Sequence, residues 1–503
     1  MSNYEYDYDD DKVAVTDEDD APAYYNGYVS ETCKKADELY NSRKYAESFL
    51  LYKKEAETTG NDYAYNALGR AYLYGRGVAK DMELAYRYYR IASESNNPDA
   101  LCSVGYCLDM GYGVEKDMDA AIRCYEASAA LGNKYAQYNL GQCYYFGRGI
   151  AIDYPRAIGY YRQAADQNHV GSLHRLGKAY ETGKGLPKDA ALAFAYSLKA
   201  AELGHAGAQT DVGFFYERGF GVAKNQDACV KWTRKGANGG NADAQCNMGH
   251  YYYYGMGVEK NFNEAFKYFK MSADQDLARG LNWVGVCYER GHGVARDYSM
   301  AVSYVKKAAD KGNIYAMNNL GNYYYNGTGV AKNNSTAFKY FKMAADKGHV
   351  NAHTWVGLLY ERGHGVTQNY AQAAAYAKKG ADLGDSAAMC NLGNYYYNGN
   401  GVAKDYAMAF KYFKMSADKG LARGINWVGV CYENGYGVAK NMTTALAYYK
   451  SAADKNESFG NLNMGKCYLY GKGVAVNRAL ARQYLTKAKS LGNPYAQDHL
   501  AKC

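Results

Sequence analysis

The stretch Gly399-Asn400-Gly401-Val402 belongs to a phrase, Gly-x-Gly followed by Val, Ile or Leu, that this 503-residue sequence contains twelve times. The first glycine recurs every 36 residues, at Gly75, Gly111, Gly147, Gly183, Gly219, Gly255, Gly291, Gly327, Gly363, Gly399, Gly435 and Gly471. A fixed period of this length is typical of a stacked solenoid, in which each unit buries its apolar face against its neighbours. The sequence therefore predicts one extended array from about residue 60 to the end, because length here counts repeats and not globular domains.

The residues around this phrase have the spacing of two helices. In the unit of Gly327, apolar side chains recur at helical spacing through residues 313–326, at Ala316, Leu320 and Tyr323. The glycines of the phrase tolerate positive φ, which favours a tight turn after this first helix. A second apolar pattern follows the turn, so each unit is predicted to be a helix-turn-helix hairpin.

Residue type specifies both ends of the second helix. The position six residues after the first glycine is Asp or Asn in all twelve units, as at Asn333, and such a short acceptor is what a helix N-cap requires. The position of Gly348 holds only Gly, Asn or Asp, which accept the left-handed conformation at a helix C-terminus. A glycine six residues before the turn, from Gly69 to Gly465, predicts close contact of the first helix with a neighbouring helix.

The two ends of the chain depart from the period. Residues 1–27 are acidic and aperiodic, and we expect a disordered arm there. Residues 28–60 show helical spacing without the glycine phrase, which predicts a degenerate helix pair that caps the array. Twelve repeats are then expected in residues 61–492, and one C-terminal capping helix in residues 493–503.

The complete pattern, Ala…Leu-Gly-x-x-Tyr-x-x-Gly-x-Gly-Val…Asp/Asn…Ala…Tyr…Ala-Ala…Gly, resembles the Sel-one-like repeat family, a relative of the tetratricopeptide repeats. The resemblance covers about residues 60–503 and its motif set is specific. It implies an all-α fold, a right-handed α/α superhelical solenoid of 36-residue repeats. It also implies an adaptor that holds other proteins together, without indicating which proteins.

Charge and hydropathy limit the classes of function that this sequence can have. The net charge is +8, although residues 1–20 carry nine Asp or Glu against Lys12 alone, so the remaining chain is basic. Lysines recur once or twice in most repeats, which favours solvated helix faces over nucleic-acid binding. The sequence has neither a signal-peptide pattern nor a run of about 18 apolar residues, and we therefore expect a cytoplasmic protein without a transmembrane segment.

Reactive side chains do not form a recognisable catalytic or metal-binding motif. Six cysteines share one first-helix position (Cys107, Cys143, Cys287, Cys431, Cys467 and Cys503) and three share another (Cys102, Cys246 and Cys390). Because these positions do not form a regular pair in each unit, buried reduced thiols are favoured over a disulfide framework. His349 and His353 have i, i+4 spacing but no recurring carboxylate or thiol partner, so we predict no metal site, no cofactor and no catalytic residues.

One position, eight residues before the turn glycine, alternates between two residue types. It holds Trp283, Trp355 and Trp427, interleaved with Asn247, Asn319, Asn391 and Asn463. Four residues earlier lie Arg279 and Arg423, a spacing that suits stacking of guanidinium on indole. Glu289, Glu361 and Glu433 alternate in the same way with tyrosines two residues before the glycine.

Two explanations of this alternation remain open. Residues 251–320 and 395–456 are close copies, so duplication of a two-repeat block would create the alternation, with tryptophans packed between repeats. In the other explanation, the first helices line a concave surface whose Asn amides and Trp rings bind an extended peptide. We take these nine Trp, Asn and Arg residues as the candidate partner-binding site.

The sequence thus predicts a non-catalytic adaptor or scaffold that binds protein or peptide along its concave face. Two other classes are the alternatives. One is a cell-wall-related or other enzyme of the repeat family, which would need a pocket with convergent histidines and carboxylates. The other is a basic-surface nucleic-acid binder, whose binding would depend strongly on salt. The partner and the oligomeric state are not specified by the sequence.

Overall fold

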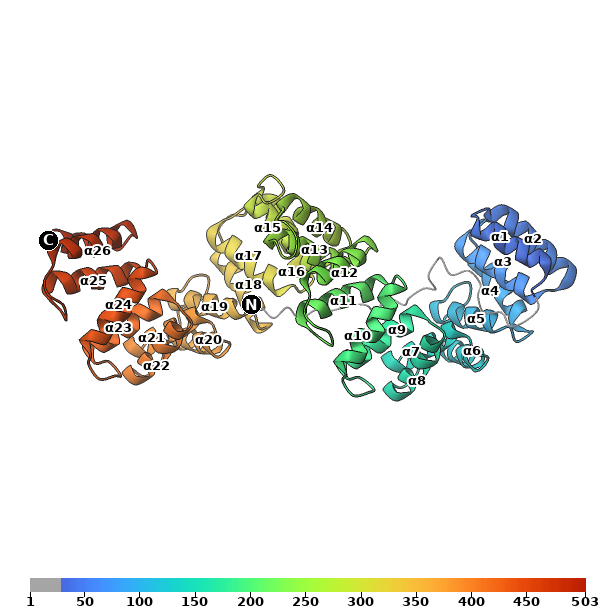
Figure 1. The fold of residues 1–503 in the computed structure, drawn as a ribbon, viewed down its shortest axis with the longest axis horizontal. Helices are drawn as coiled ribbons and strands as arrows, with labels where there is room; N and C mark the ends of the chain where they lie inside the picture. Colours follow the sequence, from blue (N-terminus) through green and yellow to red (C-terminus); the bar gives the residue numbers. More distant parts are fainter. Residues whose placement is uncertain (1–28) are drawn as a thin grey trace. The chain divides into compact units, whose positions relative to one another are not determined.

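The computed structural model describes residues 29–503, and every regular element within them is an α-helix (Figure 1). The helices are α1 (Glu31–Asn41), α2 (Tyr45–Thr59), α3 (Asp62–Tyr74), α4 (Met82–Ser93), α5 (Pro98–Met110), α6 (Met118–Ala130), α7 (Lys134–Phe146), α8 (Tyr154–Asp166), α9 (Val170–Thr182), α10 (Ala190–Glu202), α11 (Ala206–Arg218), α12 (Gln226–Asn238), α13 (Ala242–Tyr254), α14 (Phe262–Asp274), α15 (Ala278–Arg290), α16 (Tyr298–Asp310), α17 (Ile314–Asn326), α18 (Asn334–Asp346), α19 (Val350–Arg362), α20 (Tyr370–Asp382), α21 (Ser386–Asn398), α22 (Tyr406–Asp418), α23 (Ala422–Asn434), α24 (Met442–Asp454), α25 (Ser458–Tyr470), α26 (Arg478–Ser490) and α27 (Ala496–Leu500). The acidic arm predicted for residues 1–27 lies outside the described residues.

Two compact units make up the chain, Met1–Lys260 and Asn261–Cys503. Helices α1–α13 belong to the first unit and α14–α27 to the second. Inside each unit, an odd-numbered helix packs against the even-numbered helix that follows it, and each such pair packs against the next pair. This is the hairpin stacking that the 36-residue period predicts, so the all-α solenoid of helix-turn-helix repeats is confirmed.

The second helix of a repeat begins and ends where residue type predicts, and the first helix has similar caps in most repeats. In the repeat of α17 and α18, Asn313 and Asn333 precede the helices, and each side-chain oxygen accepts a backbone N–H from the first turn. Gly327 ends α17 with φ of 77° and Gly348 follows α18 with φ of 88°. An Asp or Asn side chain caps the second helix in all twelve repeats, and a residue with positive φ follows it, so both predictions are confirmed.

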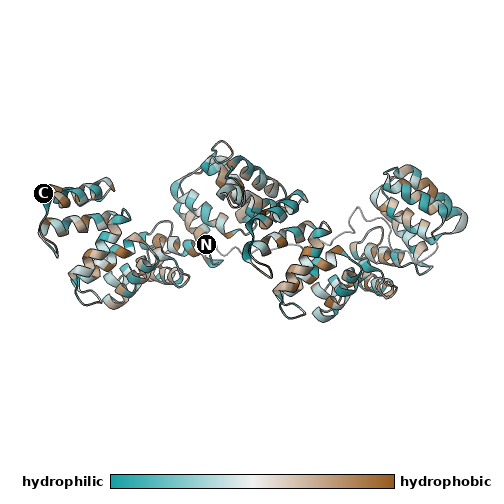
Figure 2. Cartoon of the chain, in the orientation of Figure 1, coloured by the Kyte–Doolittle hydropathy of each residue, from teal (hydrophilic) through white to brown (hydrophobic). Residues whose placement is uncertain are grey.

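The helices are amphipathic, with hydrophobic and hydrophilic residues interleaved along each of them (Figure 2). First helices of neighbouring repeats lie closer together than second helices do. In the second unit α19 contacts α21, α21 contacts α23 and α23 contacts α25, and α11 contacts α13 in the first unit. Successive second helices make no contacts of that extent in the described part of the chain. The first helices therefore form the inner layer of each unit and the second helices the outer layer.

The glycine inside the first helix is explained by contact with the second helix. A Cβ atom at Gly321 would lie 2.6 Å from the ring of Phe341, and one at Gly141 would lie 2.4 Å from the ring of Tyr161. Both rings are fully buried, so neither has room to move away. The predicted close approach is confirmed at these positions, and the cost of glycine in a helix is offset by aromatic packing.

The second glycine of each turn contacts the preceding repeat. Gly401 has φ of 72°, and a Cβ atom there would lie 2.1 Å from the carbonyl oxygen of Tyr370 in the previous second helix. Gly437 lies in the same way against Tyr406. The turn phrase therefore has two structural roles, because it reverses the chain and lets one repeat fit closely against another.

Additional helices flank the twelve repeats. Helices α1 and α2 precede the first repeat, and at their junction with α3 the half-buried Asp37 carboxylate accepts hydrogen bonds from the hydroxyls of Tyr52 and Tyr63. The short helix α27 follows the last repeat and buries Ala496 against α26, with Leu500 and Cys503 packed beside it.

All twelve cysteines of the chain are free thiols, as the irregular spacing predicts, and most of them are buried. Burial raises the pKa of the Cys143 thiol to about 11, which keeps it protonated and unreactive at neutral pH. Across residues 29–503, none of the helices has the length and apolar character that a membrane span requires.

Candidate partner-binding site

The three alternating tryptophans lie on first helices and pack against the preceding repeat. Trp283, Trp355 and Trp427 belong to α15, α19 and α23, and all three are half-buried. Each indole stacks on a phenylalanine from the preceding second helix. The ring centroids are 5.1 Å apart for Phe269 and Trp283, 5.1 Å for Phe341 and Trp355, and 4.9 Å for Phe413 and Trp427. The tryptophans are therefore part of the junction between repeats.

Tyrosines of the preceding first helix contact two of these indoles from another side. The centroid of Tyr325 lies 5.2 Å from that of Trp355, and the centroid of Tyr397 lies 5.2 Å from that of Trp427. Aromatic pairs at this distance each contribute about 0.5–1.5 kcal/mol beyond the area that they bury. With a phenylalanine on one side and a tyrosine on another, the two rings are held in a single orientation.

The alternating glutamates have partners in the next repeat. The hydroxyl of Tyr323 donates to Glu289 at 3.0 Å, and the hydroxyl of Tyr395 donates to Glu361 at 2.7 Å. Burial, together with the neighbouring carboxylate, raises the pKa of both tyrosine hydroxyls well above its usual value. Repeats that carry tryptophan and glutamate at these two positions therefore contact neighbouring repeats that carry asparagine and tyrosine there.

Two of the candidate asparagines are tied to the preceding first helix. The amide Nδ2 of Asn319 donates to Oδ1 of Asn282 at 3.1 Å, and Nδ2 of Asn463 donates to Oδ1 of Asn426 at 2.9 Å. Asn319 and Asn463 are half-buried, whereas their two partners are buried. The hydrogen bonds orient each amide, because the nitrogen must face the neighbouring helix.

The other two asparagines of the set are buried. Asn391 is 8% exposed and accepts a hydrogen bond of 2.7 Å from Nη2 of Arg423, and Asn247 on α13 is 6% exposed. The predicted stacking of Arg423 on Trp427 is wrong, since no such contact joins them among the described residues. A hydrogen bond from a charged donor contributes about 1.5–3 kcal/mol, more than an exposed cation–π contact of about 0.5–1 kcal/mol. Arg279, the other arginine of the set, is half-buried on α15.

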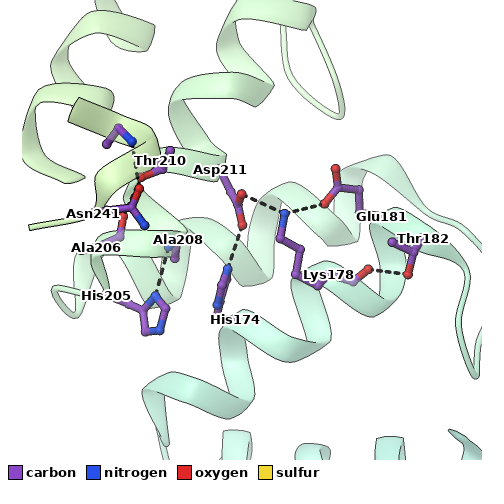
Figure 3. Close-up of polar contacts among 11 residues, drawn as sticks. His174, Lys178, Glu181, Thr182, His205, Ala206, Ala208, Thr210, Asp211 and Asn241 are labelled. Carbon is purple, nitrogen blue, oxygen red and sulfur yellow. Dashed lines mark hydrogen bonds and ion pairs between the residues drawn. The ribbon is translucent and has the colours of Figure 1, made fainter. Parts of the chain in front are cut away.

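In the first unit, a charged network is built around the repeat position that the candidate asparagines hold elsewhere (Figure 3). Asp211 on α11 aligns with Asn247 and is 1% exposed. Its Oδ2 lies 2.8 Å from Nε2 of His174, and its Oδ1 accepts from Nζ of Lys178 at 2.9 Å. Lys178 also reaches Glu181 at 3.0 Å, so one ammonium bridges two carboxylates.

The electrostatics of the network favour charged Asp211 and Lys178. Burial by itself would raise the pKa of the Asp211 carboxyl, but Lys178 and His174 outweigh it and lower that pKa to about 2. Burial would likewise lower the pKa of the Lys178 ammonium, yet Asp211 and Glu181 raise it. The carboxylate and the ammonium are each stabilised by the other, as buried charges require.

His205 lies beside this network and caps α11. Its Nδ1 accepts the backbone N–H of Ala208 at 3.0 Å, and its ring centroid lies 4.4 Å from that of His174. Burial and the neighbouring His174 lower the pKa of the His205 imidazole to about 3. The imidazole is therefore neutral at physiological pH, and the tautomer with its proton on Nε2 leaves Nδ1 able to accept the Ala208 N–H.

Sequence reasoning missed this network, although the 36-residue period contains the signal for it. His174 and Lys178 precede Asp211 by about one repeat, and residues separated in this way lie on adjacent first helices. Opposite charges at such a separation indicate a contact between repeats. The network joins the fourth and fifth repeats through groups that satisfy one another. The described residues contain no cluster of three or more His, Cys, Asp or Glu side chains that could hold a metal ion.

The stacked hairpins define the protein as an α/α solenoid of the tetratricopeptide-like class. The chain belongs to the Sel1 repeat family, because the Sel1 repeat model matches twelve consecutive segments that together cover residues 62–493. Proteins of this family generally mediate protein–protein interactions, and the solenoid is typically a non-catalytic scaffold.

A solved structure agrees with this assignment. The crystal structure of c5321, a protective antigen of uropathogenic Escherichia coli with an SLR fold, is 29% identical and has a TM-score of 0.69. That alignment covers 90% of this chain and 96% of c5321. A Sel1 repeat protein from Oxalobacter formigenes is also 29% identical, over 48% of this chain and 99% of its own length, with a TM-score of 0.46. A comparison with curated protein sequences found no match.

Proposed function

We propose that this protein is a cytoplasmic adaptor that binds an extended protein segment along its inner, first-helix layer. The binding site in the second unit would centre on Trp283, Trp355 and Trp427. Membership of the Sel1 repeat family supports a protein partner. The free thiols support a cytoplasmic location, because cysteines stay reduced in the cytoplasm.

The observation that carries the proposal is the way in which the indoles are held. Each is half-buried, so part of the ring remains accessible while a phenylalanine fixes its plane. A side chain that is already immobile loses little conformational entropy when a partner binds. Tryptophan is also among the residues that contribute most to binding energy at protein interfaces.

The asparagines between these tryptophans supply the polar part of the site. Because Asn319 and Asn463 donate their amide nitrogens to the preceding helix, their Oδ1 atoms are the groups that a partner would meet. A carbonyl oxygen of this kind accepts the backbone N–H of an extended peptide without depending on its sequence. Side-chain preference would then come from the surfaces beside the indole rings.

Substitution of all three tryptophans by phenylalanine tests the proposal. Alanine would remove the stacking and cost about 3–5 kcal/mol at each position, so unfolding would be mistaken for lost binding. Phenylalanine preserves a stacked ring but reduces the aromatic area that is accessible to a partner. The matched control is Trp232→Phe, which changes the one tryptophan outside the set.

Partners would be captured from cytoplasmic extract and identified by mass spectrometry for the wild type, the triple variant and the control. We expect the triple variant to lose a set of partners that the control retains, with circular dichroism and melting temperature close to wild type. Equal recovery of the same partners by all three proteins would refute the inner-layer site.

A further inference from the structure

A shallow groove on the outer layer of the first unit is the strongest feature that the proposed function does not use. It lies along α12 and the turn after α13, with a volume of about 380 Å³. Val230 and Gly257 line it together with Lys231, Arg234 and Lys235, and its remaining lining residues are Asp227 and Asn238. All three basic side chains of the groove are exposed.

The equivalent lysine of other second helices has an aspartate four residues later. Ion pairs of this kind are formed by Lys270 and Asp274, Lys342 and Asp346, Lys378 and Asp382, Lys414 and Asp418, and Lys450 and Asp454. In α12 the aligned positions hold Arg234 and Asn238, so an amide stands where nine of the other repeats have a carboxylate. The change from Asp to Asn removes one negative charge from a site with three cations.

Neighbouring aromatic groups hold the groove's cations in place. The Lys235 ammonium lies 4.2 Å from the ring centroid of Trp232, and Nη2 of Arg234 donates to the hydroxyl of Tyr252 at 3.4 Å. Within residues 29–503, none of the groove's three cations forms an ion pair, and Asp227 is the one acidic residue in its lining. The groove therefore presents uncompensated positive charge beside an apolar floor.

We propose that this groove binds the acidic N-terminal segment of the same chain, residues 5–20. That segment carries nine Asp or Glu and a single basic residue, Lys12, so its charge complements the groove. Tyr4, Tyr6 and Tyr8 alternate with the first acidic residues and suit an apolar floor between cations. The placement of the segment lies outside the described residues, and the proposal rests on its sequence and on the geometry of the groove.

The connecting chain is long enough for this contact. Residues 7–11 precede α1, which begins at Glu31, by about 20 residues, and an extended chain of that length spans about 65–70 Å. Helix α12 belongs to the fifth repeat after α2 inside the first unit, and five steps between helices packed about 8–10 Å apart place that separation at roughly 50 Å. The first part of the segment, residues 5–11, is therefore within reach of the groove.

The substitution Asn238→Asp tests the proposal in the full-length chain. It installs the residue that seven other repeats have at this position, so the helix is expected to fold normally while Arg234 gains an ion-pair partner. A carbodiimide forms an amide bond between a carboxylate and an amine in contact, with loss of one water. Mass spectrometry of the digested protein then identifies links between residues 5–20 and Lys231 or Lys235.

In the wild type we expect links from the acidic segment to concentrate on Lys231 and Lys235. Asn238→Asp should reduce them by about fivefold, which corresponds to one exposed ion pair of about 1 kcal/mol. The matched control is Asp346→Asn, which removes the equivalent carboxylate from the eighth repeat and should leave these links unchanged. Mixing ¹⁴N- and ¹⁵N-labelled protein should show the links within single molecules.

Three results would overturn the proposal. The first is an even spread of links over the lysines of the second helices. The second is the same yield of links in the wild type and in Asn238→Asp. The third is links that join only differently labelled molecules, which would assign the groove to contact between copies.

Discussion

Acidification is expected to destabilise the start of α11 through His205. Only a neutral imidazole can accept the Ala208 N–H at Nδ1, so protonation removes the cap and places a positive charge at a helix N-terminus. Burial and His174 lower the pKa of His205 in the folded protein to about 3, whereas an unfolded histidine titrates near about 6.5. The unfolded state therefore binds the proton first as the pH falls.

The sign and size of the effect follow from these two pKa values. Because the folded-state pKa is the lower one, the stabilisation is complete above about pH 6.5 and is lost progressively as the pH falls toward about 3. Linkage gives a loss of about 2 kcal/mol between pH 7.5 and pH 5, and about 3 kcal/mol at pH 4. Between pH 7.5 and pH 5, Asp211, whose pKa is about 2, stays ionised in the folded protein, and an unfolded aspartate with a pKa of about 3.9 is almost fully ionised as well, so Asp211 adds little to that change.

The variant His205→Asn isolates the effect, since asparagine caps the first helix at the aligned positions Asn133 and Asn313. Urea unfolding and hydrogen–deuterium exchange of α11 amides would be measured at pH 7.5 and pH 5. The wild type and the variant should have similar stability at pH 7.5, and the variant should be more stable by about 2 kcal/mol at pH 5. His349→Asn is the matched control, and its effect should be confined to α19.

A difference between wild type and His205→Asn that is the same at both pH values would refute the reasoning. That result would mean that the imidazole keeps an ordinary pKa in the folded protein. An effect of equal size on α11 amides from His349→Asn would also refute it, because it would show a general loss of stability with acid.

Two further substitutions probe contacts between helices. Asp211→Asn removes the buried carboxylate that pairs with the Lys178 ammonium and leaves Glu181 as the remaining acidic partner of Lys178. The free energy of unfolding should therefore fall by about 3 kcal/mol in urea titrations, and an unchanged midpoint would contradict a role for the network in stability. Gly321→Ala places a methyl group 2.6 Å from the fully buried ring of Phe341 and should cost about 1–3 kcal/mol. Gly357→Ala, whose nearest neighbour would be 3.2 Å away, should cost less, and equal melting temperatures for the two variants would contradict this explanation.

The order of residues specifies the repeat, its helix-turn-helix pattern and both ends of its second helix. Each cap depends on a side chain and a backbone group within about four residues, as for Asn333 and the N–H of Thr336. Positive φ at Gly327 is likewise a property of one residue and its immediate neighbours. Such short-range requirements appear directly in the order of residues, and the 36-residue period repeats them twelve times.

The contacts made by the alternating tryptophans and asparagines depend on the tertiary structure. The sequence indicates that tryptophan and asparagine share one position, but not that Trp355 stacks on Phe341 or that Asn319 bonds to Asn282. The expected stack of Arg423 failed for the same reason, because its amide acceptor lies 32 residues earlier in the chain. The stacking of one hairpin on the next selects these partners.

The buried network of the first unit is a second case in which the packing of repeats, and not the local sequence, selects the partners. In the sequence, Asp211 and Lys178 look like ordinary polar residues of two different amphipathic helices. Only packing places them 2.9 Å apart, with Asp211 buried and Lys178 half-buried, where each stabilises the charge of the other. Local chemistry determined where the helices begin and end, and the contacts across repeats determined which side chains are buried, paired or left accessible to a partner.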